Sequence, residues 1–371
     1  MINTIRLVKE FCNLVSIDAL PYKEREMAEV LKGYLTELGF EVTEDKAGEY
    51  YEGNCGNVYG YLPGTLEGPP LLFSAHMDTV EPGNNKRAIV HLDGTITSDG
   101  TTVLGADDLS GVVAILEAIR TIKEQGLEHR SIEVLFTIAE EVYIRGSEVF
   151  DYSKIKAKEA YVLDLDGTIG TAAIAAPTLV SFTAKITGRA AHAGFAPEEG
   201  IHAIMVAARA INKIKQGRID ENTTVNIGTI SGGKAKNVVP DLCVLQGEIR
   251  SLSHEKAVAL GEEIKSVFDE VVREHEAGLE YTTSFGCIAY EVSPKHSVVK
   301  RFEKVCQDFS CETKLIQTFG GSDNNNFLKN GITGIVLACA MHQVHSVKEY
   351  TTIKELEKCC SIVCGLMQSK E

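Results

Sequence analysis

The chain has 371 residues, of which 44% are hydrophobic and 24% charged, so it has the composition of an ordinary globular protein and enough length for two domains. A formal net charge of −15 argues against nucleic acid and against an anionic membrane as partners. No apolar run is long enough to span a bilayer, the N-terminal segment lacks the pattern of a signal peptide, and the ten cysteines have no zinc-knuckle or CxxC spacing. We therefore expect a cytoplasmic protein with reduced thiols.

Residues 1–178 alternate between helical and strand patterns. Residues 24–38 have helical periodicity and are followed by Gly39, whereas residues 40–43 and 57–62 have the pattern of strands. Alternation of this kind predicts a mainly parallel sheet with helices on both faces.

An apolar run at residues 71–75 leads directly into His76, Met77 and Asp78. Such a run suits a strand buried on both faces, and ligand sites of open α/β sheets lie where these strands end. Side chains two positions apart on a strand point the same way, so His76 and Asp78 can lie side by side. The pair fits a metal site, in which a carboxylate often orients the ligating histidine, and it equally fits an ordinary strand end.

Three further segments carry acidic residues toward the same region. Asp107 and Asp108 precede a helical pattern at residues 112–122, Glu140 and Glu141 follow an apolar strand at residues 132–138, and Asp164 and Asp166 end a third strand. Uncompensated, these carboxylates would repel one another and cost several kcal/mol. Divalent cations are the usual compensation, so the sequence predicts a metal centre at one edge of the sheet.

The pattern changes near Pro177. Residues 179–187 alternate apolar and polar side chains, as a half-solvated strand does, and further strands at 224–230, 242–250 and 279–285 accompany helices at 201–215 and 254–275. We expect an inserted α+β domain over residues 179–287, with two helices on one face of an antiparallel sheet. Residues 288–371 then return to the domain formed by residues 1–178.

Seven segments resemble the motifs of the M20 zinc peptidases, and most closely those of the peptidase T-like branch. In chain order they are SAHMDTV at 74–80, GADD at 105–108, AEE at 139–141, LD at 163–164, GRAAHAG at 188–194, GGKAKNVVP at 232–240 and HSVKE at 345–349. The resemblance spans nearly the whole chain. It implies that the inserted domain is a lid or dimerisation domain and that the protein is a homodimer.

The resemblance also implies two Zn²⁺ ions per chain. One would be held by His76, Asp107 and Asp164, the other by His345, Asp107 and Glu141, with Asp107 bridging and a cis peptide bond between Asp107 and Asp108. Co²⁺ or Mn²⁺ would accept a similar set of nitrogen and oxygen donors. From the residues alone, Asp166 competes with Asp164 and His342 competes with His345; we prefer Asp164 and His345 because their neighbours fit the motifs.

Further roles follow from the same resemblance. Glu140 would be the general base beside a metal-bridging hydroxide, and Asp78 would orient His76. His192 would stabilise the oxyanion of the tetrahedral intermediate, in its own subunit or across a dimer. Asn237 and Arg250 would hold the terminal carboxylate of the substrate, for which the planar arginine fork is well suited.

These features predict a dinuclear zinc exopeptidase that acts on short peptides, an aminopeptidase or tripeptidase. Two alternatives remain: an amidohydrolase of N-acyl amino acids or dipeptides with the same metal site, and a catalytically inactive binding protein of the same fold. The retention of His76, Asp107, Glu140, Glu141 and His345 argues against the inactive protein.

Overall fold

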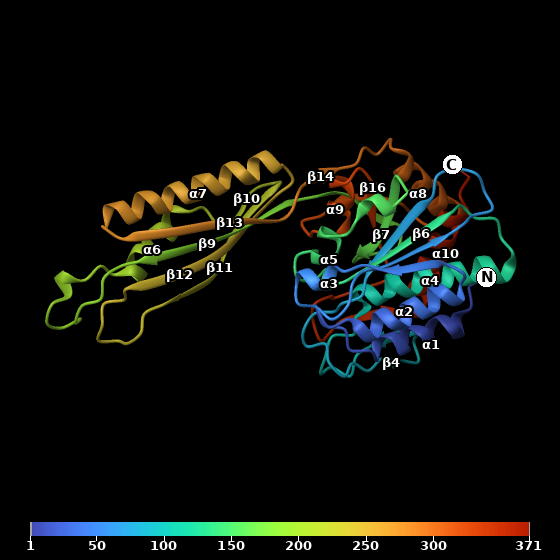
Figure 1. The fold of residues 1–371 in the computed structure, drawn as a ribbon, viewed down its shortest axis with the longest axis horizontal. Helices are drawn as coiled ribbons and strands as arrows, with labels where there is room; N and C mark the ends of the chain where they lie inside the picture. Colours follow the sequence, from blue (N-terminus) through green and yellow to red (C-terminus); the bar gives the residue numbers. More distant parts are fainter. Residues whose placement is uncertain (1, 371) are drawn as a thin grey trace. The chain divides into compact units, whose positions relative to one another are not determined.

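The computed structural model describes residues 2–370, which form two compact units. The first unit comprises the chain up to Ala175, the segment Glu291–Thr318 and the chain from Ser322 onward. The second comprises Ala176–Tyr290 together with Phe319–Gly321. The chain therefore leaves the first unit after its N-terminal half, builds the second, and returns (Figure 1).

Within the described residues, the first unit is built on a nine-stranded sheet with the order β1-β2-β6-β3-β7-β16-β8-β14, in which β15 pairs with β8. The central pairs β6–β3, β3–β7 and β7–β16 are parallel, and the flanking pairs β1–β2, β2–β6 and β16–β8 are antiparallel. The strands are β1 Glu41–Glu44, β2 Val58–Leu62, β3 Leu71–His76, β6 Ile132–Thr137, β7 Glu159–Leu165, β8 Thr171–Ala176, β14 Tyr290–Glu291, β15 Lys314–Gln317 and β16 Thr333–Ala338. A small sheet joins β4 Ile89–Val90, β5 Thr95–Thr97 and β17 Tyr350–Thr352.

Every residue of β3 and β6 is buried, because helices cover both faces of the large sheet. On one face, Phe73 stacks on Tyr161, whose hydroxyl donates to the carbonyl of Val298 in α8. On the other face, Leu72 and Val162 pack in a cluster with Phe327 of α9. The helices are α1 Thr4–Val15, α2 Arg25–Glu37, α3 Ala47–Tyr50, α4 Ala106–Gln125, α5 Arg145–Glu148, α8 Ser297–Asp308, α9 Asp323–Lys329 and α10 Ile353–Gln368, with a 3₁₀ turn at Tyr152–Lys154.

The second unit is a five-stranded antiparallel sheet with the order β10-β11-β12-β9-β13. Helices α6 and α7 pack on one face of this sheet, where alternate residues such as Phe182, Ala184 and Leu245 form its core (Figure 1). The opposite face carries polar residues, as is common for antiparallel sheets. The elements are β9 Thr178–Thr187, a 3₁₀ turn Pro197–Glu199, α6 Ala203–Lys213, β10 Gly217–Asp220, β11 Thr223–Gly232, β12 Leu242–Ser251, α7 His254–Glu274 and β13 Gly278–Cys287.

The fold class expected from the sequence, a mainly parallel α/β sheet with an added antiparallel α+β portion, is confirmed. A bend at residues 319–320 leads into helix α9, which begins at Asp323. The Asn325 side chain accepts a hydrogen bond from the amide of Ser322 at 3.0 Å, so this polar run caps the buried start of the helix. None of the helices in residues 2–370 is long and apolar enough to cross a membrane.

Candidate metal centre

His76 is the last residue of β3 and is only 1% exposed. Its Nε2 lies 3.1 Å from Oδ1 of Asp107 and 3.9 Å from Oδ1 of Asp164. Its Nδ1 lies 2.9 Å from the main-chain carbonyl of Asp78 and 3.5 Å from that residue's carboxylate. The ring is thus held from one side by Asp78, while its other nitrogen faces two carboxylates.

Asp107 lies between the two histidines. While Oδ1 faces His76, Oδ2 lies 3.1 Å from Nε2 of His345, and that nitrogen is also 3.0 Å from Oε2 of Glu141. Asp107 and Asp108 have non-helical dihedrals at the start of α4 and are joined by a cis peptide bond. Strand ends, a helix start and a C-terminal loop therefore bring together the five side chains that the resemblance names as ligands.

Glu140 belongs to the same cluster. Potential donor atoms of His76, Asp107 and Glu141 all lie within 4.8 Å of one another, and so do those of His76, Glu140 and Asp164. Glu140 therefore lies among the candidate metal ligands, close enough to act as a base beside a bound ion or as a ligand.

For two of the ligands the sequence offered two candidates each, and the structure places the candidates differently. Asp164 lies in the cluster, whereas Asp166 is exposed to solvent. His345 contacts Asp107 and Glu141, whereas Nε2 of His342 lies 2.9 Å from Oε2 of Glu355 and its ring stacks on Tyr350.

The electrostatics of the cluster fit bound cations. Burial above all raises the pKa of Glu140, Glu141 and Asp164, and for Glu140 the Asp164 charge raises it further. Burial opposes ionisation of Asp107, but hydrogen bonds with His345 and His76 outweigh it and lower its pKa. Hydrogen bonds to Asp107 and Glu141 in turn raise the pKa of His345 to about 10. Without metal ions, protons on these groups would reduce the repulsion between the buried carboxylates. Divalent cations would neutralise the same carboxylates directly.

One buried atom supports the same interpretation. Among residues 2–370, Oε1 of Glu141 is buried and has no hydrogen-bond partner, although its other oxygen contacts His345. Two imidazoles and several carboxylates are the donor set of a zinc, cobalt or manganese site. The residues present therefore fit metal binding.

Two carboxylates beside the cluster accept hydrogen bonds from main-chain amides, which the sequence motifs did not predict. Both oxygens of Asp78 accept backbone N–H bonds, from Glu140 at 3.0 Å and Glu141 at 3.1 Å. Glu349 accepts from the amides of Gly105 at 2.7 Å and Asp107 at 2.9 Å. Glu349 closes the HSVKE segment, which is the only sequence signal that pointed to it.

A second supporting group comes from α9. The Asp323 carboxylate is buried and accepts bonds from the hydroxyls of Thr137, at the end of β6, and Ser147. Asn326 donates to the Ser147 hydroxyl at 2.9 Å, and Asn324 donates to the carbonyl of Gly334 at 2.9 Å. These contacts give the unusual Asn324-Asn325-Asn326 run a structural role in fixing α9 behind the strand ends.

The remaining predicted site residues belong to the second unit. His192 lies in the loop after β9, and Asn237 in the segment between β11 and β12; both are exposed. Arg250, on β12, is already engaged: Nε lies 2.8 Å from Oε1 of Glu248, and Nη1 donates to the carbonyl of Phe319 at 2.8 Å. Glu248 therefore occupies the Nε and Nη2 side of the Arg250 guanidinium.

A parallel α/β sheet that carries clustered His and carboxylate donors at its strand ends is a fold and a site that fit the class of metal-dependent hydrolases. Comparison with known proteins agrees. The sequence profile of the peptidase dimerisation domain of M20 peptidases matches residues 174–276, and that of peptidase family M28 matches residues 57–211.

Several relatives match over the whole chain. The crystal structure of a tripeptidase from Staphylococcus aureus is 34% identical and covers 99% of this chain and 98% of its own, with a TM-score of 0.96. That of the aminopeptidase PepT from Bacillus cereus is 38% identical with the same coverage and a TM-score of 0.92. The uncharacterised protein YqjE of Bacillus subtilis is 38% identical over 99% of both chains. The chain therefore belongs to the M20 peptidase family, in its peptidase T-like branch, and is a peptidase.

Proposed function

We propose that this chain is a two-metal exopeptidase that releases the N-terminal residue of short peptides, tripeptides foremost. The observation that carries the proposal is the position of Asp107, whose two carboxylate oxygens face different histidines, His76 and His345, each with a further acidic neighbour. A single carboxylate placed between two ligand groups is what a bridged pair of cations requires. The likeness to a tripeptidase and an aminopeptidase over 98–99% of each chain supports the substrate class.

We assign His76, Asp107 and Asp164 to one cation and His345, Asp107 and Glu141 to the other. Zinc suits these donors best, and cobalt or manganese would accept them. When bound, such a pair polarises the scissile carbonyl and acidifies a water molecule at neutral pH.

Side chains of this protein would supply proton transfer, positioning of the ligands and binding of the substrate. Glu140, buried beside this position, would take a proton from the attacking water and return it to the leaving amine. Asp78 would orient His76 through the Nδ1 atom of its ring. Asp78 would also fix the amides of Glu140 and Glu141, so that the base and the ligand keep their relative positions. His192 would donate to the developing oxyanion, and Asn237 and Arg250 would bind the substrate's terminal carboxylate.

We further propose that the protein is a homodimer that works in the cytoplasm. The match to a peptidase dimerisation domain covers most of the second unit, and β13 forms an edge of that unit's sheet with mostly exposed side chains. An open strand edge is suited to pairing with a second copy. All ten cysteines are free thiols, as a reducing compartment would keep them.

The test is a substrate panel. Metal-free enzyme is reconstituted with Zn²⁺, Co²⁺ or Mn²⁺ and incubated with tripeptides, dipeptides, C-terminally amidated tripeptides and N-acetyl amino acids, and the released amino acids are separated and identified. We expect cleavage of the first peptide bond of tripeptides, weaker cleavage of the amidated forms, loss of activity with chelator and its return with metal. Hydrolysis of N-acetyl amino acids alone would replace the proposal with an amidohydrolase. A metal-loaded protein that cleaves nothing in the panel would contradict it.

A further inference from the structure

His192 lies in an exposed loop of the second unit whose backbone is pinned at several points. The amide of Ala193 donates to the carbonyl of Asn237 at 3.0 Å, and His192 forms a β-bridge with Val238. The carbonyl of His192 accepts from the amides of Phe195 at 3.3 Å and Ala196 at 3.1 Å. The main chain around the histidine is therefore a tight, hydrogen-bonded turn, although it faces solvent.

The imidazole of His192 is held in one tautomer by this turn. Its Nδ1 accepts hydrogen bonds from the amides of Gly194 at 3.1 Å and Phe195 at 3.2 Å. A backbone amide can only donate, so the nitrogen that receives these two bonds carries a lone pair and no proton. In the neutral ring the single proton must then reside on Nε2, which leaves that nitrogen as the hydrogen-bond donor of the ring.

The ring of Phe195 holds the imidazole from one face. The two ring centroids are 4.3 Å apart with an interplanar angle of 28°, which is a stacked arrangement. Phe195 is 85% exposed, so the hydrophobic core does not account for its position. The same residue therefore contributes an amide to Nδ1 and an aromatic surface to the ring.

We propose that Phe195 is a positioning residue that, with the amides of residues 194 and 195, presents His192 as a neutral Nε2–H donor. This inference rests on the proposed function, in which that donor meets the oxygen that becomes negative during peptide hydrolysis. A donor held in place before the reaction stabilises developing charge better than one that must reorient. Nothing in this role requires His192 to transfer a proton.

The tautomer can be tested without any assay of activity. Enzyme labelled with ring-¹⁵N histidine is examined by two-bond ¹H–¹⁵N correlation spectra, and the His192 signals are identified by their loss in His192→Gln. We expect an unprotonated Nδ1 and a protonated Nε2 in the wild type and in Phe195→Tyr, which keeps the ring. Phe195→Leu, which keeps apolar bulk without the ring, should show a mixture of tautomers. A proton on Nδ1 in the wild type, or a Phe195→Leu spectrum identical to the wild type, would overturn the proposal.

Kinetics on a tripeptide substrate test the consequence. We expect kcat of Phe195→Leu to fall by about two- to tenfold, with KM nearly unchanged and with Phe195→Tyr close to the wild type. Thermal unfolding at the wild-type temperature would show that the leucine variant is folded. If Phe195→Leu shows altered tautomers but an unchanged kcat, Phe195 has no role in turnover. If the wild type cleaves no peptide, the proposed function fails, and the positioning of His192 is still decided by the spectra.

Discussion

Glu140 and Glu141 are adjacent in the chain, yet their side chains have different neighbours. Oε2 of Glu141 contacts His345, whereas the carboxylate of Glu140 lies near His76 and Asp164. Their amides are both bound by Asp78, which fixes the turn that separates the two side chains. A base and a ligand can therefore occupy consecutive positions, provided that the turn between them is rigid.

Glu140→Gln tests this division. The substitution keeps the size of the side chain but removes its ability to accept a proton, so turnover should fall by about 10²–10⁴-fold. Both metal ions and the affinity for substrate should be retained, as measured by elemental analysis and by equilibrium binding. Glu148→Gln, at an exposed position nearby in the sequence, serves as control and should behave as the wild type. Loss of a metal ion from Glu140→Gln would show that Glu140 is a ligand.

Glu349 offers a second test at the level of a single residue. Its carboxylate accepts both the Gly105 and the Asp107 amides, so it orients the segment that carries the bridging aspartate. In Glu349→Gln one oxygen becomes an NH₂ group that faces an N–H donor. Substitutions of residues that support metal ligands typically cost 10–100-fold in metal affinity, and we expect about that loss in a chelator competition titration.

The matched control is Glu355→Gln. Glu355 binds His342 and the Thr352 hydroxyl, neither of which we assign to the metals, so its substitution should leave metal affinity intact. Equal metal affinities for the Glu349 variant and the wild type would mean that this carboxylate does not orient Asp107.

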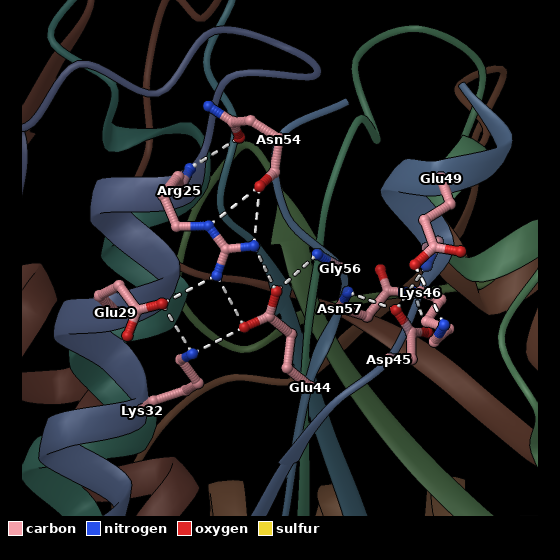
Figure 2. A network of polar contacts seen from close by, with 11 residues as sticks. Arg25, Glu29, Lys32, Glu44, Asp45, Lys46, Glu49, Asn54, Gly56 and Asn57 are labelled. Carbon is pink, nitrogen blue, oxygen red and sulfur yellow. Dashed lines mark hydrogen bonds and ion pairs between the residues drawn. The ribbon is translucent and has the colours of Figure 1, made fainter. Parts of the chain in front are cut away.

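At the scale of elements, α2 is joined to β1 by an ion-pair network (Figure 2). Arg25 and Lys32 project from the helix and meet the carboxylate of Glu44, which is 17% exposed, at N–O distances of 2.7 Å each. The amide of Gly56 also donates to Glu44 at 3.0 Å. This one side chain therefore connects a helix, the edge strand and the loop before β2.

The network makes stability depend on pH in a defined direction. Burial alone would raise the pKa of Glu44, but bonds from Arg25, Lys32 and Gly56 outweigh it and lower the pKa from 4.5 to about 2. Because the folded pKa is below the unfolded one, the contribution to stability is complete above the unfolded value and is lost as pH falls through the folded value. Glu44→Gln should therefore lower the unfolding free energy at pH 7, and its deficit should shrink toward pH 3.

Urea unfolding at both pH values measures this deficit. Glu29→Gln is the control, because Glu29 belongs to the same network but its side chain is 55% exposed. A deficit of the same size at pH 7 and pH 3 would show that the charge of Glu44 is not what stabilises the contact.

At the scale of the whole molecule, the proposed dimer can be tested by combining defects. We mix His192→Ala chains with Glu140→Gln chains. If each active site uses His192 of the other subunit, both homodimers are nearly inactive, but every heterodimer contains one intact site. Random exchange should then restore about a quarter of wild-type activity, since half the dimers are mixed and each has one working site.

Light scattering establishes the oligomeric state, and differently tagged chains establish that subunits exchange. If exchange is complete and mixing restores no activity, His192 serves its own subunit or has no part in catalysis. A monomer in solution would contradict the dimer directly.

Much of this molecule is encoded in local patterns. The apolar runs that become β3, β6 and β7 and the helical periodicity of α2, α7 and α10 are short-range signals, because burial on a strand or helix repeats with a fixed period. The ligand types could be predicted for the same reason: each motif is a few residues long and places a His or carboxylate at a strand end. Helix α9 was missed because its polar sequence is stabilised by distant partners, such as Gly334 and Ser147.

Only the tertiary structure separates groups that are equivalent in the sequence. Asp164 and Asp166 are two positions apart at the end of β7, and only Asp164 lies close to His76 of the neighbouring strand and therefore in the cluster. The contact between Glu349 and Asp107 joins residues 242 positions apart, and no local pattern reports such a contact. The residue types of the centre follow from short motifs, whereas the carboxylates that hold its main chain in place depend on long-range packing, because a buried amide can be satisfied by any acceptor that the fold brings to it.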